Sequence, residues 1–227
     1  MAKDERVKAK VVYFSRLHSL EEGICVKDNA IVIRENGVET KVIDNSELIL
    51  LGGHNLENYM AGIAVGYYMG IPMDIIVKTL KSFKGVAHRI EFVKEVNGVA
   101  YYNDSKGTNP DAAIKGIQAM NRKTVLIGGG YDKGVAFDDW IKAFDGKVKK
   151  LVLLGQTEKM ISDTAAKYGF TDVIFAKDLK EAVSMCNEYA EPGEAVLLSP
   201  ACASWGMFDN YEQRGDMFKE YVNELGA

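Results

Sequence analysis

Residues 103–110 bring together side chains that could bind an anionic ligand. They read Asn-Asp-Ser-Lys-Gly-Thr-Asn-Pro, so a carboxylate, an ammonium and two hydroxyls share one short segment. Asn109 is suited to cap a following helix and Pro110 to its first turn, which would place the segment at the positive end of a helix dipole. A polar capping loop is the simpler interpretation, but a cap does not require Lys106. The segment therefore favours an anion-binding loop.

A glycine-rich segment at residues 128–134 carries a second lysine. It reads Gly-Gly-Gly-Tyr-Asp-Lys-Gly. Gly128 and Gly130 match the first two glycines of the dinucleotide-binding fingerprint, but Lys133 takes the position of the third. A phosphate loop of the GxxxxGK[ST] type is also absent from the chain. Two interpretations remain, which are a turn that lets a ligand approach Lys133 and an ordinary glycine-rich turn after a strand.

A third segment, residues 199–205, reads Ser-Pro-Ala-Cys-Ala-Ser-Trp. Its small residues permit close approach of the backbone, and Ser204 offers a hydroxyl. Cys202 could be a nucleophile, but His88 is the one histidine in the second part of the chain that could activate it, so a small buried side chain is favoured.

His54 and His88 lack the carboxylate spacing of a metal site and are expected to pack or cap. Arg89 is suited to a phosphate at a domain junction.

The spacing of apolar residues predicts the elements that position these segments. Before residue 43, short β-branched runs at 11–14 and 31–33, with turn signals at Asp28-Asn29 and Asn36-Gly37, predict strands and hairpins. Helices are expected at 55–69 and from Pro72 to about residue 83. After a break at residues 84–87, strands alternate with helices. The expected strands are 90–96, 99–102, 124–127, 151–154, 173–175 and 195–198, and the helices are 110–120, 137–144, 157–168, 179–189 and 210–225.

These continuous apolar strands predict a mainly parallel sheet covered by helices on both faces, in an α/β Rossmann-like domain. Ligands of such sheets bind beyond the carboxyl ends of the strands, where the three polar segments would lie.

The chain has 227 residues, 47% of them apolar, and a formal charge of −4, which argues against a nucleic-acid partner. It has no apolar run long enough to span a membrane, and its three scattered cysteines are typical of a cytoplasmic protein.

Taken in order, the motifs of this chain resemble the Mur ligase family, and within it the branch that adds D-glutamate. The His-Arg-Ile-Glu and Asn-Asp-Ser-Lys-Gly-Thr-Asn sequences separate this branch from other members. At positions 107 and 211, the family commonly has alanine and phenylalanine instead of glycine and tyrosine. The matching segments are residues 53–58, 88–91, 103–109, 129–133, and 198–204 with 210–215.

The resemblance implies an ATP-dependent ligase of peptidoglycan precursor synthesis. Such an enzyme uses ATP and Mg²⁺ to phosphorylate the terminal carboxylate of UDP-N-acetylmuramoyl-L-alanine, and the amine of D-glutamate then displaces the phosphate. By position, it assigns ATP contacts to Asn58, Arg89 and Asp104. It assigns the D-glutamate site to Lys106, Thr108, Lys133, Ser204 and Tyr211. No catalytic residue or metal ligand is assigned to this chain.

The family's phosphate loop, Mg²⁺ ligands, carbamylated lysine and UDP-binding domain lie upstream of the matched region. The chain is therefore expected to be a C-terminal portion that is inactive alone, with residues 1–86 from the rear of the central ATP-binding domain and 87–227 as the amino-acid-binding domain. The whole ligase is expected to be a cytoplasmic monomer that binds neither nucleic acid nor membrane. A dinucleotide-binding domain and a non-catalytic interaction domain remain as alternatives.

Overall fold

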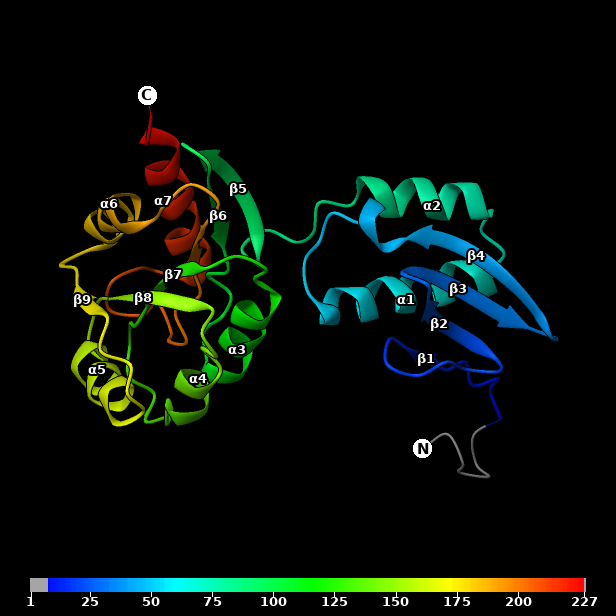
Figure 1. Cartoon of the computed structure of the whole chain (residues 1–227), viewed down its shortest axis with the longest axis horizontal. Coiled ribbons are helices and arrows are strands. Elements are labelled where there is room, and N and C mark those ends of the chain that lie inside the picture. The colour runs from blue at the N-terminus through cyan, green and yellow to red at the C-terminus, as the bar shows by residue number, and fades with distance from the viewer. Residues whose placement is uncertain (1–7, 227) are drawn as a thin grey trace. The chain divides into compact units, whose positions relative to one another are not determined.

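The computed structural model describes residues 8–226, and its chain divides into two compact units between Lys84 and Gly85 (Figure 1). This division lies two residues before the boundary expected from the sequence. The two units are described separately below.

Unit 1, which ends at Lys84, contains from residue 8 onward a four-stranded sheet and two α-helices. The strands lie in chain order, with β1 parallel to β2 and the remaining pairs antiparallel. Its elements are β1 (Phe14–Ser15), β2 (Gly23–Lys27), β3 (Ala30–Glu35), β4 (Val38–Asp44), the 3-10 helix η1 (Asn45–Glu47), α1 (Gly53–Tyr68) and α2 (Met73–Ser82).

The hairpins of unit 1 form where the turn signals predicted them. Asp28 and Asn29 have positive φ between β2 and β3, and so do Asn36 and Gly37 between β3 and β4, as tight two-residue turns require. The strand expected at residues 11–14 is wrong in extent, because only the two residues of β1 pair with β2. The core joins strand residues to the two helices, as Ile31, Ile33, Met60, Ile63 and Leu80 illustrate.

Unit 2, which begins at Gly85, is a six-stranded sheet with helices on both faces. The strand order is β5-β6-β10-β7-β8-β9, and all neighbours are parallel except β5 and β6. Its elements are β5 (Glu91–Val96), β6 (Val99–Asn103), α3 (Pro110–Ala119), β7 (Thr124–Gly128), α4 (Asp138–Lys142), β8 (Val148–Leu153), α5 (Glu158–Lys167), β9 (Val173–Phe175), α6 (Leu179–Tyr189), β10 (Ala195–Leu198) and α7 (Tyr211–Glu224).

The mainly parallel α/β architecture expected from the sequence is confirmed. The central strands β6, β7 and β10 are buried along their whole length, which explains why their apolar residues are continuous rather than alternating. Helices α6 and α7 pack on one face, and α3, α4 and α5 lie on the other (Figure 1). Because β10 lies between β6 and β7, segments distant in the sequence end side by side at one edge of the sheet.

Candidate functional site

The three polar segments leave the sheet at the same level. In the register of the central strands, Leu198 of β10 pairs with Asn103 of β6 and with Ile127 of β7. The segments that begin at residues 104, 128 and 199 therefore start next to one another, at the carboxyl edge where α/β sheets bind ligands. The N-terminus of α3 lies in the first of these loops, and Asn109 caps it by accepting a hydrogen bond from Ala112 N at 2.9 Å.

A buried arginine on α7 ties two of these loops together. The guanidinium of Arg214 donates to the Ser105 hydroxyl at 2.9 Å, to the Ser105 carbonyl at 2.8 Å and to the Cys202 carbonyl at 3.1 Å. Ser105 Oγ in turn donates to the carbonyl of Tyr211 at 2.8 Å. Arg214 is only 2% exposed, and burial lowers its pKa to about 10, so the guanidinium stays charged at neutral pH.

The glycine-rich segment at residues 128–130 allows its backbone to approach the loop after β10 closely. Gly129 N donates to Pro200 O at 2.9 Å, and Tyr131 N donates to Ala203 O at 3.0 Å. A Cβ on Gly130 would lie 2.5 Å from Ala203 O, closer than side chains tolerate. The next helix, α4, starts only at Asp138, so these glycines do not lead directly into a helix N-terminus as the dinucleotide fingerprint requires. The dinucleotide-binding alternative therefore loses its structural basis.

Asp104 lies beneath its loop rather than on the surface. It is 4% exposed, and its two carboxylate oxygens accept hydrogen bonds from Ser199 Oγ at 2.7 Å and Ile90 N at 3.2 Å. Burial raises the pKa of this carboxyl group to about 7, and the hydrogen bonds and nearby arginines only partly oppose that effect. In this structure Asp104 is committed to holding its own loop.

The residues predicted for D-glutamate have a different character, because their polar groups are largely uncommitted. Lys106 donates to Tyr211 Oη at 3.0 Å, and Lys133 is exposed on its loop. Within residues 8–226, neither lysine forms an ion pair with a carboxylate. Thr108 is half-buried and Ser204 is 4% exposed, and neither hydroxyl bonds to another residue in that range. These groups come from all three loops and from the first turn of α7.

The residues predicted for ATP are distributed over both units. Asn58 is exposed on α1 of unit 1, where its side-chain amide donates to Asn55 Oδ1 at 3.3 Å. Arg89 is exposed in unit 2, and its guanidinium has no ion pair within the described part of the chain. The neighbouring His88 is buried, with its ring nitrogen Nδ1 3.1 Å from Asn103 Nδ2, which agrees with a packing role. The ATP assignment stays a prediction.

Cys202 lacks the environment of a nucleophile. It is 2% exposed, and burial raises the pKa of its thiol to about 11. Its sulfur lies 3.3 Å from Thr157 Oγ1, the side-chain hydrogen-bond contact that the structure gives for it within residues 8–226. A thiol of this kind stays protonated at neutral pH, in accordance with the small buried residue that the sequence favoured.

Sequence reasoning missed Arg214 although a signal was present. Arg214, Phe218 and Val222 follow one another at intervals of four residues on α7, and all three are buried. A charged residue on the apolar stripe of a helix must find buried partners. This spacing therefore indicated that Arg214 needs buried partners, although the contacts with the two loops come from the fold.

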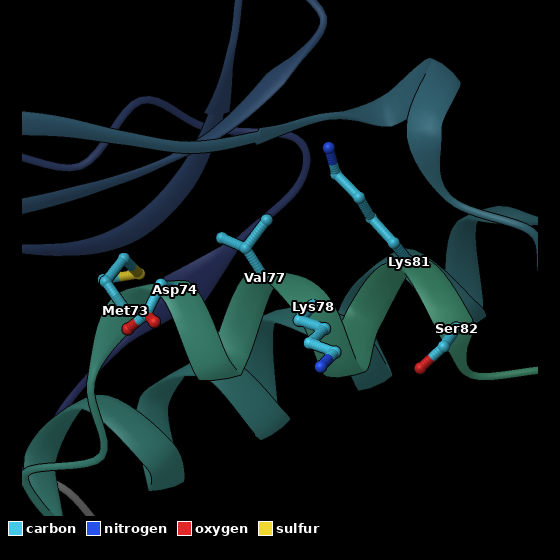
Figure 2. Close-up of a pocket in the computed structure, with 6 residues that line it drawn as sticks. All are labelled: Met73, Asp74, Val77, Lys78, Lys81 and Ser82. Carbon is cyan, nitrogen blue, oxygen red and sulfur yellow. The ribbon is translucent and has the colours of Figure 1, made fainter.

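A surface hollow on α2 of unit 1 is a poor candidate for the site. Figure 2 shows that its side chains come from successive turns of one helix and point in different directions rather than toward one another. One of its lysines, Lys81, already pairs with Glu47. The hollow is lined by Met73, Asp74, Val77, Lys78, Lys81 and Ser82, and none of these was predicted as a site residue.

Comparison with known proteins shows which family the chain belongs to. The family described as "Mur ligase, glutamate ligase domain" matches residues 88–202, which include the first two loops and the start of the third. The chain belongs to the Mur ligase family. A relative from Thermoanaerobacter sp. (strain X514), "UDP-N-acetylmuramoylalanine--D-glutamate ligase", is 57% identical over 222 residues, covering 97% of this chain and 49% of that protein. A relative of the same name from Lachnoclostridium phytofermentans is 51% identical, covering 97% and 48%.

Solved structures share the fold of this Mur ligase chain at low sequence identity. The UDP-N-acetylmuramate-alanine ligase of Thermotoga maritima has a TM-score of 0.61 at 20% identity, covering 86% of this chain and 43% of that one. A folylpolyglutamate synthase of Mycobacterium tuberculosis, solved with ADP, has a TM-score of 0.61 at 13% identity, covering 85% and 44%. The chain thus spans about half the length of the curated relatives it matches.

Proposed function

We propose that this chain forms the D-glutamate-binding part of an ATP-dependent ligase that joins D-glutamate to UDP-N-acetylmuramoyl-L-alanine. The observation that carries the proposal is the pair of lysines, Lys106 and Lys133, which lie at one sheet edge and have no carboxylate partner among residues 8–226. D-glutamate has two carboxylates, and two ammonium groups provide a matching number of positive charges. The names of the 57% and 51% identical relatives support the same substrate.

For the reaction to proceed, this part of the ligase must hold D-glutamate by its carboxylates and leave its amine free to attack. The ligase transfers the γ-phosphoryl group of ATP to the terminal carboxylate of UDP-N-acetylmuramoyl-L-alanine and releases ADP. The D-glutamate amine then attacks the acyl carbon, loses a proton, and phosphate leaves as the amide bond forms. Lys106 and Lys133 would bind the carboxylates, and the hydroxyls of Thr108 and Ser204 would orient them. Tyr211 begins α7, whose positive dipole end favours an anion there.

The described residues fit ATP in part and Mg²⁺ not at all. Arg89, which is exposed and has no ion pair with any residue that the structure describes, suits a phosphate, and Asn58 can hydrogen-bond a base. Asp104 presents no unengaged oxygen in this structure, since both of its oxygens accept hydrogen bonds. No group of three or more histidine, cysteine, aspartate or glutamate side chains among residues 8–226 could hold a metal ion. We therefore assign this chain no step that passes through Mg²⁺, and we place the metal ligands elsewhere in the whole ligase.

The setting of the whole ligase follows from its substrates and the chain's composition. We place it in the cytoplasm, as a monomer that serves cell-wall synthesis, and thereby cell shape and division. Buried thiols and a charge of −4 fit that setting and do not suggest nucleic acid as a partner. None of the helices among the described residues is long and apolar enough to cross a membrane.

Nuclear magnetic resonance (NMR) titration of the 227-residue chain with D-glutamate tests the proposal. We expect weak, saturable shifts of the backbone amides of Lys106, Lys133 and Tyr211, together with the loops that contain Thr108 and Ser204. L-glutamate and succinate are the controls, and both should bind more weakly. The chain alone should not hydrolyse ATP, because it has no GxxxxGK[ST] loop. Shifts that scatter over the surface, or equal binding of succinate, would count against a D-glutamate site.

A further inference from the structure

Each of the two lysines in the proposed site has its ammonium close to an aromatic ring. Lys106 Nζ lies 4.8 Å from the centre of the Tyr211 ring, and Lys133 Nζ lies 5.0 Å from the centre of the Trp205 ring. Both rings come from the segment between β10 and the first turn of α7. Tyr211 is already part of the predicted site, whereas no role has been given to Trp205.

The loop contacts around Trp205 give its ring a defined place. Trp205 directly follows Ser204, which is buried, and the ring of Tyr131 packs edge-on against it with 5.5 Å between ring centres. The backbones of the two loops join at the bridge between Tyr131 and Ala203. Trp205 nevertheless remains 55% exposed, so its ring faces solvent where a small ligand can reach Lys133.

Other lysines over rings in the described residues differ from these two in one respect. Five further lysines stand over tyrosine rings, and each of the five also pairs with a carboxylate. They are Lys10, Lys142, Lys150, Lys167 and Lys180, paired with Glu35, Asp139, Asp172, Asp138 and Glu224. Lys106 and Lys133 each lie close to a ring and have no carboxylate partner in the part of the chain that the structure describes.

This difference has a physical meaning. A protein carboxylate would hold an ammonium in place but would also neutralise the charge that a ligand needs. The face of an aromatic ring attracts the ammonium through its quadrupole and leaves the net positive charge intact. A ring is therefore well suited to hold a lysine in readiness for an incoming carboxylate.

We propose that Trp205 is the positioning residue of Lys133, holding its ammonium over the indole face so that it meets one carboxylate of D-glutamate. The inference rests on the proposed function, because it takes D-glutamate as the ligand. Trp205 need not touch the substrate, since it acts through Lys133.

A double-mutant cycle on the 227-residue chain tests the proposal, with D-glutamate affinity measured by NMR titration. W205L removes the ring and keeps an apolar side chain, and we expect it to raise the Kd about two- to fivefold, the effect of an exposed lysine–ring contact. W205F keeps a ring and should restore most of the affinity. In a K133M background, W205L should change the Kd by less than about 1.5-fold, because the ammonium through which Trp205 acts is absent. Y168L, which removes a ring under Lys142 and Lys167, is the control and should leave the Kd unchanged.

A ligand-free spectrum provides a readout that a general loss of structure would not mimic. The ε-methylene protons of Lys133 should be shifted upfield by the Trp205 ring, and the shift should disappear in W205L and persist in W205F. If W205L weakens binding equally in the wild-type and K133M backgrounds, or if the Lys133 protons show no ring-dependent shift, the positioning role is wrong while the D-glutamate site stands. If the wild-type chain shows no saturable D-glutamate binding, the proposed function fails and the inference fails with it.

Discussion

Arg214 Nε lies 2.9 Å from Ser105 Oγ, and this buried hydrogen bond joins residues that are 109 positions apart. The same guanidinium reaches the Cys202 carbonyl, so one side chain fixes the loop after β6 to the segment after β10. Lys106 follows Ser105 directly, and Ser204 lies two residues after Cys202. The distance between two groups of the proposed D-glutamate site thus depends on a residue that need not contact the ligand.

Replacing Arg214 by lysine should destabilise unit 2 and weaken D-glutamate binding together. An ammonium cannot reproduce the planar fork that serves three acceptors, and it is costly to desolvate at a site only 2% exposed. We expect R214K to lower the free energy of unfolding by about 2–4 kcal/mol, measured by urea denaturation with tryptophan fluorescence. R122K is the control, since Arg122 forms a partly exposed pair with Glu95 and should change stability by less than about 1 kcal/mol. Equal stability of R214K and the wild-type chain would show that the hydrogen bonds of Arg214 to the two loops do not stabilise unit 2.

Removing either site lysine should weaken D-glutamate binding without unfolding the chain. In the whole ligase, K106A and K133A should each raise the apparent KM for D-glutamate at least tenfold, which corresponds to about 1.4 kcal/mol. K142A is a matched control, because Lys142 also stands over a tyrosine ring but pairs with Asp139 on α4. An unchanged KM in both site variants would mean that the two loops are ordinary surface turns that do not bind D-glutamate.

Most of the scaffold could be predicted from the sequence because local signals determine it. The Asn36-Gly37 turn, the Asn109 cap with Pro110 behind it, and helix α6 formed where the pattern placed them. The continuous apolar strands also predicted a parallel sheet. The position of β10 between β6 and β7 had no local signal, since strand order is set by packing across the whole sheet.

The contacts between distant segments of the site, and the burial that results from them, could not be predicted from the sequence. The sequence placed Asp104 and Lys106 in one polar loop, and nothing local showed that the first would be buried and the second exposed. That separation depends on Ser199, which follows β10, and on Ile90, which precedes β5, because both donate hydrogen bonds to Asp104. Likewise, no local pattern links Trp205 to Lys133, which lies 72 positions earlier in the chain and is brought over the indole ring by the fold.

Alanine at Gly215 should destabilise the chain although it lies inside a helix. Replacing a helical glycine normally stabilises a helix by about 0.5–1 kcal/mol. A Cβ on Gly215 would lie 2.2 Å from His88 Nδ1, and His88 is buried against Asn103, so the ring has to move. We expect G215A to lower the unfolding free energy by about 1–3 kcal/mol, measured by urea denaturation. G62A in α1, where a Cβ meets nothing within 4 Å, should instead stabilise unit 1. Stabilisation in both variants would mean that His88 is not held in place.

Asp104 should make the stability of unit 2 fall as the pH rises through the weakly acidic range. Its pKa is about 7 in the folded chain because of burial, and about 3.9 in an unfolded chain. Below pH 4, both states carry the proton. Between about pH 4 and 7 the unfolded chain releases it first, which favours unfolding, and above pH 7 the effect is complete.

The substitution D104N isolates this contribution, because an amide does not titrate and can still hydrogen-bond Ser199. The unfolding free energy of the wild-type chain minus that of D104N should fall between pH 4 and 7, by at most about 4 kcal/mol, and then stay level. Urea denaturation at several pH values measures it, with the fluorescence of Trp140, buried in unit 2, as the signal. D163N, at an exposed aspartate on α5, should give a nearly level difference over the same range. A D104N difference that rises with pH would mean that Asp104 is ionised in the folded chain, and that its hydrogen bonds from Ser199 and Ile90 outweigh the cost of its burial.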